Sequence, residues 1–356
     1  MTATDQEVIP VASNDTDRRV TIVDVARHAG VSTAAASKVL RRSDGVSDAM
    51  RERVERSMAE LDYRPLASAR GMRGKTFTLG VLVMSFANPY TSQIIDGITS
   101  VVAPAGYELL AAQSGQTAEA HQHTINAFRD RRMDGLLLIT PLGTQEYLSQ
   151  IGRGVPTVVI GRHGPGDHFD TVASDDMAGS RLIVDHLTSQ GHRHIAYVQH
   201  APSTATDPRL PQNVRTEGYL QAMRDAGLAE HIDVVPTMWD EEGGHQAARA
   251  LLARNELPTA IHAGADVVAF GALNEFWLAR RDVPGEIAVA GYDNTSAASF
   301  EPIGLTSVDQ FGSRMGAMAA ELLLERIGGR AESRHDLILP ELIVRRTTSA
   351  PARVGG

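Results

Sequence analysis

Several polar and aromatic side chains come directly after short apolar runs, at positions where they could bind a small molecule. Four of them are Asn88, Tyr90, Arg162 and Asp293. Because ligands of open α/β sheets lie beyond the carboxyl ends of the strands, these positions are candidates for a ligand site. Aspartate and arginine make paired hydrogen bonds to neighbouring hydroxyls, and a tyrosine ring can stack on a sugar face. The set therefore suits a polyhydroxylated ligand.

Two histidine pairs could bind a metal, but their spacing does not favour it. His121 and His123, like His192 and His194, lack the helical i, i+4 spacing, and the chain has no cysteine to complete a ligand set. Hydrolase signatures such as Gly-x-Ser-x-Gly are absent. Residues 74–76 (Gly-Lys-Thr) end a loosened phosphate-loop pattern, but they precede a predicted strand, whereas a phosphate loop must follow one. We therefore expect no catalytic residues, no metal and no cofactor.

Length and composition bound the class of protein. A chain of 356 residues predicts two or three compact units, and its 42% hydrophobic content is enough for real cores. The absence of cysteine argues against a disulfide-stapled secreted protein. The first 19 residues lack the apolar run of a signal peptide, and no stretch reaches the roughly 18 apolar residues that span a membrane. We therefore expect a cytoplasmic protein with no membrane partner.

Charge is unevenly distributed along the chain. The whole chain has a net charge of −9, yet residues 20–75 hold eleven Lys/Arg against seven Asp/Glu, a net charge of +4. The first 19 residues carry −2 and residues 76–356 carry −11. A basic segment on an acidic body directs only that segment at phosphates, which indicates a head that binds nucleic acid.

The basic segment has the pattern of a helix-turn-helix. Thr21 with Asp24 is typical of a capping box, so a helix is predicted to begin there and to end at Gly30. Ser32 is expected to cap a second helix, from Thr33 to about Leu40, which would fit the DNA major groove. A third helix after Ser47 is expected to close a mini-core with the apolar stripe Met50, Val54, Met58 and Leu61.

These residues closely resemble the headpiece of the LacI-type (LacI/GalR) transcriptional regulators. The matching motifs are Asp24-Val25-Ala26, Ala29-Gly30-Val31-Ser32 and Ser37-Lys38-Val39-Leu40. The similarity continues to about Thr348, so it covers nearly the whole chain apart from both tails. It implies an α/β protein in four parts: a tail (1–19), an all-α helix-turn-helix headpiece (20–63), a hinge (64–77) and a two-lobed periplasmic-binding-protein-like body with two parallel sheets (78–350).

The resemblance also implies which residues bind DNA. Thr33, Ala34 and Lys38 would read base edges, since a lysine can donate to guanine O6 and N7. Arg41 replaces a common asparagine and is expected on phosphate, while Met72 replaces a leucine that wedges into the minor groove. An inert linker is the alternative interpretation of the hinge. The full predicted DNA-binding set is Thr21, Ser32, Thr33, Ala34, Ser37, Lys38, Arg41, Arg64, Arg70, Met72 and Arg73.

Beyond the hinge, apolar runs alternate with helical stretches, which predicts two parallel α/β sheets. The runs predicted as strands are 79–84, 107–112, 135–140, 157–160, 195–199, 234–238, 260–262 and 287–290. By resemblance, the chain crosses between two lobes near Asp175, Leu305 and Gly328, with the ligand in the cleft. Lobe 1 would then hold residues 78–175 and 306–327, and lobe 2 would hold residues 176–305 and 328–350.

The candidate ligand residues only partly follow the family's pattern. Arg215 matches it, and Asp293 retains the expected acid. Asn213, however, stands where sugar-binding members carry another arginine, Gly161 replaces a common aspartate, and Ala265 replaces a frequent asparagine. These losses predict an altered effector rather than an ordinary hexose. The predicted effector set is Asn88, Tyr90, Arg162, Asn213, Arg215, Asp266 and Asp293.

Together these patterns predict a ligand-responsive transcriptional repressor. It would bind a near-palindromic operator as a homodimer, because one headpiece reads too few base pairs. A small molecule, expected to be a sugar or sugar derivative, would close the cleft, change the separation of the two hinges and so switch operator binding. The alternative is a solute-binding receptor without catalytic activity. The body alone favours that alternative, but the basic head and the missing signal peptide argue against it.

Overall fold

The computed structural model describes residues 20–40, 45–64, 75–200 and 207–348. The chain divides into two compact units, Met1–Thr76 and Phe77–Gly356, and each is described by itself. The boundary falls one residue before the predicted end of the hinge.

The described residues of the first unit form three short helices. They are α1 (Ile22–Ala29), α2 (Thr33–Leu40) and α3 (Asp48–Glu60). The predicted capping box is confirmed, because the Thr21 and Asp24 side chains each bond to the other residue's backbone N–H. Gly30 ends α1 in the left-handed conformation, with φ of 64°, which a glycine adopts without steric cost. The sequence therefore determines both ends of the first helix locally.

Small apolar residues hold the three helices together. Val25, Ala36 and Val54, one from each helix, are fully buried at the centre of the cluster. Met50, Met58 and Leu61 from the predicted stripe are partly buried and pack against it. Because Ala36 faces inward and has little volume, α2 lies close to its neighbours and its opposite face remains exposed.

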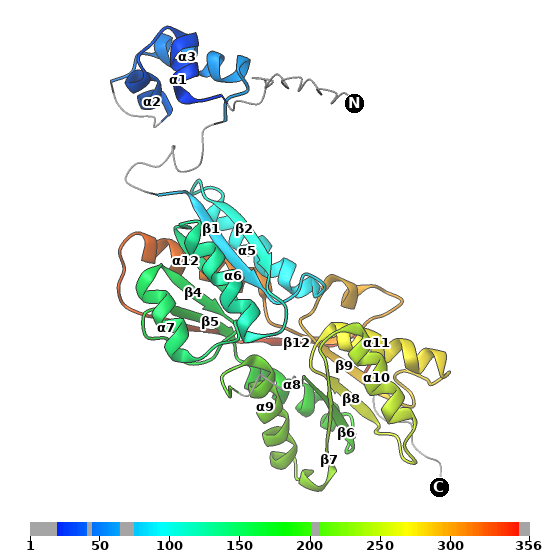
Figure 1. Ribbon diagram of the computed structural model, residues 1–356. Coiled ribbons are helices and arrows are strands. Elements are labelled where there is room, and N and C mark those ends of the chain that lie inside the picture. The colour runs from blue at the N-terminus through cyan, green and yellow to red at the C-terminus, as the bar shows by residue number, and fades with distance from the viewer. Residues whose placement is uncertain (1–19, 41–44, 65–74, 201–206, 349–356) are drawn as a thin grey trace, which may run out of the picture. The chain divides into compact units, whose positions relative to one another are not determined.

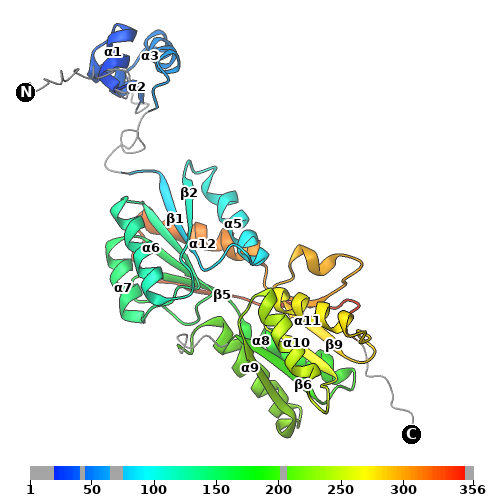
Figure 2. The ribbon, with the colours of Figure 1, turned by 45° about the vertical axis from the view of Figure 1, so that its right-hand side comes forward.

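The second unit contains two six-stranded sheets, one in each lobe (Figures 1 and 2). The lobe 1 sheet has the order β11-β5-β4-β3-β1-β2, and its strands are all parallel. Its strands are β1 (Thr78–Val83), β2 (Glu108–Gln113), β3 (Gly135–Ile139), β4 (Thr157–Ile160), β5 (Asp170–Ser174) and β11 (His335–Ile338). The predicted fold class is confirmed, because helices alternate with parallel strands in both lobes.

The lobe 2 sheet has the order β12-β10-β9-β8-β6-β7 and is parallel except for β12, which runs antiparallel to β10. Its strands are β6 (Ile195–His200), β7 (Ile232–Thr237), β8 (Ala260–Ala263), β9 (Ala288–Tyr292), β10 (Thr306–Asp309) and β12 (Glu341–Ile343).

Helices cover both faces of each sheet. In lobe 1 they are α5 (Pro89–Val102), α6 (Ala118–Asp130), α7 (Gln145–Gly154) and α12 (Gly312–Ile327). In lobe 2 they are α8 (Asp176–Ser189), α9 (Pro211–Asp225), α10 (Glu241–Leu252) and α11 (Asp266–Leu278), with short 3₁₀ turns at Ala229–His231 and Ser296–Ser299. Strand side chains alternate between the two covered faces: Val81 packs with the α5 and α12 side, and Leu82 with the α6 and α7 side. Inner strands such as β3 and β4 are buried on both faces, so they read as continuous apolar runs. The edge strands β2, β7, β11 and β12 are partly exposed.

Two of the three predicted lobe crossings are wrong in position. The first lies between β5 and α8, as predicted near Asp175. The second follows β10 rather than preceding it, so residues 306–309 belong to lobe 2 and not to lobe 1. The third follows β11, so residues 335–338 belong to lobe 1 and not to lobe 2. The reason is backbone pairing: β10 bonds to β9 and β11 bonds to β5, and these short strands have no strong apolar signal.

No helix among the described residues is both long and apolar enough to cross a membrane.

Candidate functional site

The second helix of the headpiece exposes a small polar face. Thr33, Ala34 and Lys38 are exposed and Ser37 is half-buried, while Ala36 points into the core. At 100° per residue the four outward side chains lie on one side of the helix, opposite the buried face. Ser32 caps the helix, since its Oγ accepts from the Ala35 N–H at 3.1 Å. This face can therefore present donors and methyl groups to the edges of bases.

The other predicted DNA-binding residues have different surroundings. Thr21 is exposed, and its hydroxyl donates to Asp24 Oδ2 at 2.6 Å as part of the cap. Arg64 is exposed, and its Nε lies 3.8 Å from Asp62 Oδ1. Arg41, Arg70, Met72 and Arg73 lie outside the described residues, so their roles stay predictions.

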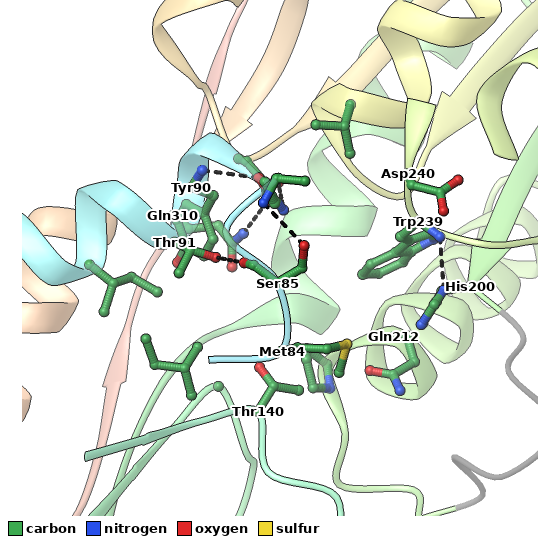
Figure 3. A pocket seen from close by; sticks show the side chains of 18 of the residues that line it. Met84, Ser85, Tyr90, Thr91, Thr140, His200, Gln212, Trp239, Asp240 and Gln310 are labelled. Carbon is green, nitrogen blue, oxygen red and sulfur yellow. Dashed lines mark hydrogen bonds between the residues drawn. The ribbon is translucent and has the colours of Figure 1, made fainter. Parts of the chain in front are cut away.

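A cavity of about 660 Å³ lies between the two lobes (Figure 3). Side chains from lobe 1 form one wall, and side chains that follow the strands of lobe 2 form the other. Its polar and aromatic lining includes Ser85, Asn88, Tyr90, Thr91, Gln116, Thr140, Asp176, His200, Gln212, Arg215, Trp239, Asp240, Asp293 and Gln310. A cleft of this size and mixed lining is typical of a site for a small polar molecule.

Arg215 is the centre of a buried polar network on the lobe 2 wall. Its Nε donates to Asp176 Oδ1 at 2.6 Å, its Nη1 to the Gly264 carbonyl at 2.8 Å and its Nη2 to Gln310 Oε1 at 3.0 Å. The guanidinium lies 3.8 Å from the centroid of the Tyr292 ring, a cation–π contact. Arg215 is thus fixed in place, and it orients the surrounding acceptors.

The pKa values of two carboxyls in this network shift in opposite directions. Burial would raise the pKa of Asp176, but the Arg215 guanidinium and the His163 ring hold it below its usual value. Burial raises the pKa of Asp293 to about 8, against the attraction of Arg215. Asp293 accepts from Gln310 Nε2 at 2.6 Å and from Asn88 Nδ2 at 3.3 Å. The network therefore shifts the pKa values of its two carboxyls in opposite directions.

The structure brings four of the seven predicted effector residues to the cavity wall. They are Asn88, Tyr90, Arg215 and Asp293. Asn88 and Tyr90 come from the start of α5 in lobe 1 and lie opposite the two lobe 2 residues. Tyr90 also hydrogen-bonds through its hydroxyl to Met315 Sδ at 3.6 Å, which fixes the ring.

The other three predicted residues do not line the cavity. Arg162 is buried and pairs with Asp207, while the Asn213 amide donates to the Asp207 carbonyl at 2.7 Å. Asp266 is buried and accepts from Ser307 Oγ at 2.6 Å and from the Thr295 N–H at 2.7 Å, so it joins the loop after β9 to β10. A position after the carboxyl end of a strand is not enough to predict that a residue lines the cavity. The side chain there can instead hydrogen-bond to groups of neighbouring loops.

Several lining residues of lobe 2 were not predicted from the sequence, among them His200, Gln212 and Trp239. His200 is the last residue of β6, and Trp239 follows β7. The carboxyl-end rule that selected Asn88 could therefore have found both. Gln212 lies in the first turn of α9, after a loop, and no sequence signal marks it.

Hydrogen bonds and ion pairs connect the two lobes beside the cavity. Arg162 from lobe 1 pairs with Asp207 of lobe 2, and Arg209 of lobe 2 donates to Gln145 Oε1 of lobe 1 at 2.9 Å. His163 of lobe 1 bonds to Asp176 Oδ2 at 2.7 Å. We refer to these three contacts as the lobe bridge. They stabilise one arrangement of the lobes around the cavity.

One histidine of each pair singled out in the sequence bonds within the fold. His121 is buried, accepts from the Leu142 N–H at 3.0 Å and bonds to the Gly115 carbonyl. His192 Nδ1 bonds to Thr259 Oγ1 at 3.0 Å. Within the described ranges, no group of three or more His, Asp or Glu side chains could hold a metal ion.

Comparison with known proteins gives matches to two domain families. Residues 21–65 match the family described as bacterial regulatory proteins, lacI family, and residues 184–348 match the periplasmic binding protein-like domain. The HTH-type transcriptional repressor PurR of Pasteurella multocida is 31% identical over 335 residues, covering 93% of this chain and 99% of that protein. The ribose operon repressor of Escherichia coli K12 is 32% identical over 313 residues, covering 86% and 93%.

A solved structure is similar along the same length. The lac repressor dimer bound to operator and the anti-inducer ONPF has a TM-score of 0.79 and is 27% identical, covering 94% of this chain and all of that chain.

Proposed function

Because this chain belongs to the LacI family of bacterial regulatory proteins and is a DNA-binding transcriptional regulator, we propose how its two sites cooperate. It represses transcription by binding a near-palindromic operator as a homodimer, and a small molecule in the cavity between the lobes controls that binding. One observation carries the proposal: the same chain holds a helix with an outward polar face and a cavity walled by two lobes.

On the DNA side, α2 enters the major groove. Lys38 donates to guanine, while Thr33 and Ala34 contribute a hydroxyl and a methyl contact. A homodimer is required because two-fold symmetry of the protein matches two half-sites. The related lac repressor, whose structure is described as a dimer bound to operator, supports this assembly.

On the ligand side, Asn88, Tyr90, Arg215 and Asp293 form the effector site together with Trp239. The aromatic rings of Tyr90 and Trp239 suit the apolar face of a sugar ring, and the carboxyl and amide groups suit its hydroxyls. A sugar or sugar derivative is therefore the effector class. The relative named as the ribose operon repressor supports it.

The two sites communicate through the angle between the lobes. A ligand that touches both walls stabilises one angle, and this sets the separation of the two hinges in the dimer. It can shift the equilibrium only by its differential affinity for the two states, so a hundredfold preference contributes about 2.7 kcal/mol.

The experiment starts from the full-length protein and a pool of random duplex DNA, from which bound sequences are selected. Fluorescence anisotropy then compares Lys38→Ala with Arg53→Ala, which removes an equal charge from the exposed face of α3. We expect Lys38→Ala to lose about 10- to 100-fold in affinity for the selected site over random DNA, since a good base contact discriminates by about 1–3 kcal/mol. Arg53→Ala should keep that ratio. Equal losses in both variants would contradict a base-reading role for Lys38.

A further inference from the structure

The cavity offers no uncompensated positive charge among the described residues that line it. Arg215 uses all three guanidinium nitrogens on Asp176, Gly264 and Gln310. Two histidines, His200 and His245, are the other basic side chains among the described lining residues. The Nδ1 atom of His245 lies 2.9 Å from Glu275 Oε1, so this ring already faces an acid. At the start of α10 the wall carries three exposed acids, Asp240, Glu241 and Glu242. An anionic ligand would therefore meet repulsion at the rim and no free cation inside.

His200 is held as a neutral hydrogen-bond donor. Its Nδ1 lies 3.0 Å from the backbone N–H of Trp239, which can only donate (Figure 3). Nδ1 must therefore accept, so the ring proton of the neutral imidazole is on Nε2. The Trp239 ring packs beside it with centroids 5.1 Å apart. Burial lowers the pKa of His200 to about 4, which keeps the ring uncharged at neutral pH.

Besides the Nε2–H of His200, the side-chain amide of Gln212 is a second group on this wall that can bond to a ligand. Gln212 is only 3% exposed and lines the cavity. Its side-chain amide has no hydrogen bond to another described residue. Because the residue lines the cavity, a ligand there can bond to this amide. The amide offers both a donor and an acceptor, so it can bind one hydroxyl in two ways or one carbonyl group.

We propose that His200 and Gln212 form a neutral recognition corner that determines effector specificity in this chain. The corner reads a hydroxyl or carbonyl group of an uncharged ligand, and the described cavity walls disfavour phosphate esters, because they offer no free cation. This inference rests on the proposed function, because it concerns the same cavity. It adds that the effector is uncharged and that two residues outside the Arg215 network select it.

The first experiment uses the full-length protein with Trp277→Phe, which leaves Trp239 as the only tryptophan and hence as a fluorescence reporter in the cavity. The probes are pairs that differ in one phosphate: ribose and ribose 5-phosphate, glucose and glucose 6-phosphate, N-acetylglucosamine and its 6-phosphate. Cellobiose is added as a larger neutral sugar. We expect saturable binding of at least one neutral sugar, with any phosphate partner at least about 10-fold weaker. Binding of an ester as tight as that of its sugar, or no binding of any neutral sugar at millimolar concentration, would overturn the inference.

The second experiment tests the corner itself with the neutral sugar that binds best. Gln212→Leu removes the amide at similar volume and should weaken binding about 10-fold, the effect of one lost hydrogen bond. Gln221→Leu, the same change on the exposed face of the same helix, is the matched control and should bind as the parent does. His200→Phe should also weaken binding, and His200→Gln should restore most of it, because the glutamine can accept from Trp239 and donate to the ligand.

Unchanged affinity in Gln212→Leu would remove Gln212 from the site and overturn the corner. Operator binding is measured separately on the selected DNA. A protein that binds its operator but prefers phosphate esters would contradict this inference alone, while loss of all specific DNA binding in the parent would contradict the proposed function.

Discussion

Arg215 connects three separate parts of the cavity wall. It contacts the start of α8 through Asp176, the end of β8 through Gly264 and the loop after β10 through Gln310. A buried ion pair of this kind adds little net stability over apolar packing, but breaking it leaves a charge in a low-dielectric site. The residue therefore matters most for keeping three loops in one arrangement.

Replacement of Arg215 by alanine should destabilise the body strongly. Asp176 and Asp293 would lose their shared cation while remaining buried, so we expect the free energy of unfolding in urea to fall by about 3–5 kcal/mol. The control is Arg181→Ala, which breaks the exposed pair with Asp225 within lobe 2 and should cost less than about 1 kcal/mol. Similar losses in the two variants would contradict the role assigned to the buried network.

Because the pKa of His200 is low in the folded protein, the stability of the fold should decrease as the pH falls. The unfolded chain takes up a proton on His200 below pH 6.5, whereas the folded chain does so only near pH 4. The folded form therefore loses stability as the pH falls through this window, by at most about 1.4 kcal/mol per unit. Urea unfolding of the wild type and His200→Gln at pH 7 and pH 5 should show the wild type losing more. A constant difference between them would contradict a neutral buried ring.

At the scale of elements, the contact of α5 with α12 holds lobe 1 together. The two helices are distant in sequence but pack on the same face of the sheet. Gly316 permits this approach, because a Cβ there would lie 2.0 Å from the Ile94 carbonyl oxygen. Since α12 follows the second lobe crossing and Asn88 caps the start of α5, this packing also positions the lobe 1 wall of the cavity.

A methyl group at Gly316 should force the helices apart. We expect Gly316→Ala to lower the free energy of unfolding by about 1–3 kcal/mol, the usual cost of overpacking a close contact. Gly154→Ala at the end of α7 is the control, since its Cβ would lie 3.6 Å from the nearest heavy atom, Arg129 Nη2. That change should be neutral or slightly stabilising. Thermal unfolding monitored by circular dichroism would compare the two, and equal melting temperatures would contradict the close-packing argument.

At the scale of the whole body, the lobe bridge links ligand affinity to lobe arrangement. Its members come from the ends of β4 and α7 in lobe 1 and from the segment before α9 in lobe 2. The remaining member, Asp176 at the start of α8, also lines the cavity. The others lie beside the cavity, so a change in them alters the equilibrium between lobe arrangements rather than direct ligand contacts.

Asp207→Asn should therefore weaken effector binding without touching the ligand. The substitution removes the charge that pairs with Arg162 and Arg209, and the arrangement that places both walls on the ligand becomes less populated. We expect the apparent Kd of the best-binding neutral sugar, read by Trp239 fluorescence, to rise about 5-fold or more. Asp225→Asn, which disrupts an exposed pair within lobe 2, should leave Kd unchanged. An unaltered Kd in Asp207→Asn would show that the bridge has no influence on closure.

Local sequence determined the headpiece almost completely. The cap at Thr21, the glycine at Gly30 and the cap at Ser32 act through residues within a few positions of one another, so their spacing is sufficient to place the helices. The family membership predicted from the same motifs is confirmed by relatives that match along nearly the whole chain. All eight predicted strands are present in the body. Several of them, such as β1, β3 and β4, are buried on both faces and are therefore apolar throughout.

Tertiary structure decided what depends on partners far apart in the chain. β5, β10, β11 and β12 were not predicted, and two lobe crossings were misplaced, because short strands are defined by the neighbour to which they hydrogen-bond. The same holds for the cavity. Arg162 and Asp293 both follow a strand, yet one turns into an ion pair beside the cavity and the other faces into it. His200 becomes a fixed donor only because the backbone of Trp239, on another strand's loop, bonds to its ring. The spacing of residues along the chain determines local hydrogen bonds and the periodicity of apolar positions. The direction of a side chain in a loop depends instead on the distant group to which it bonds.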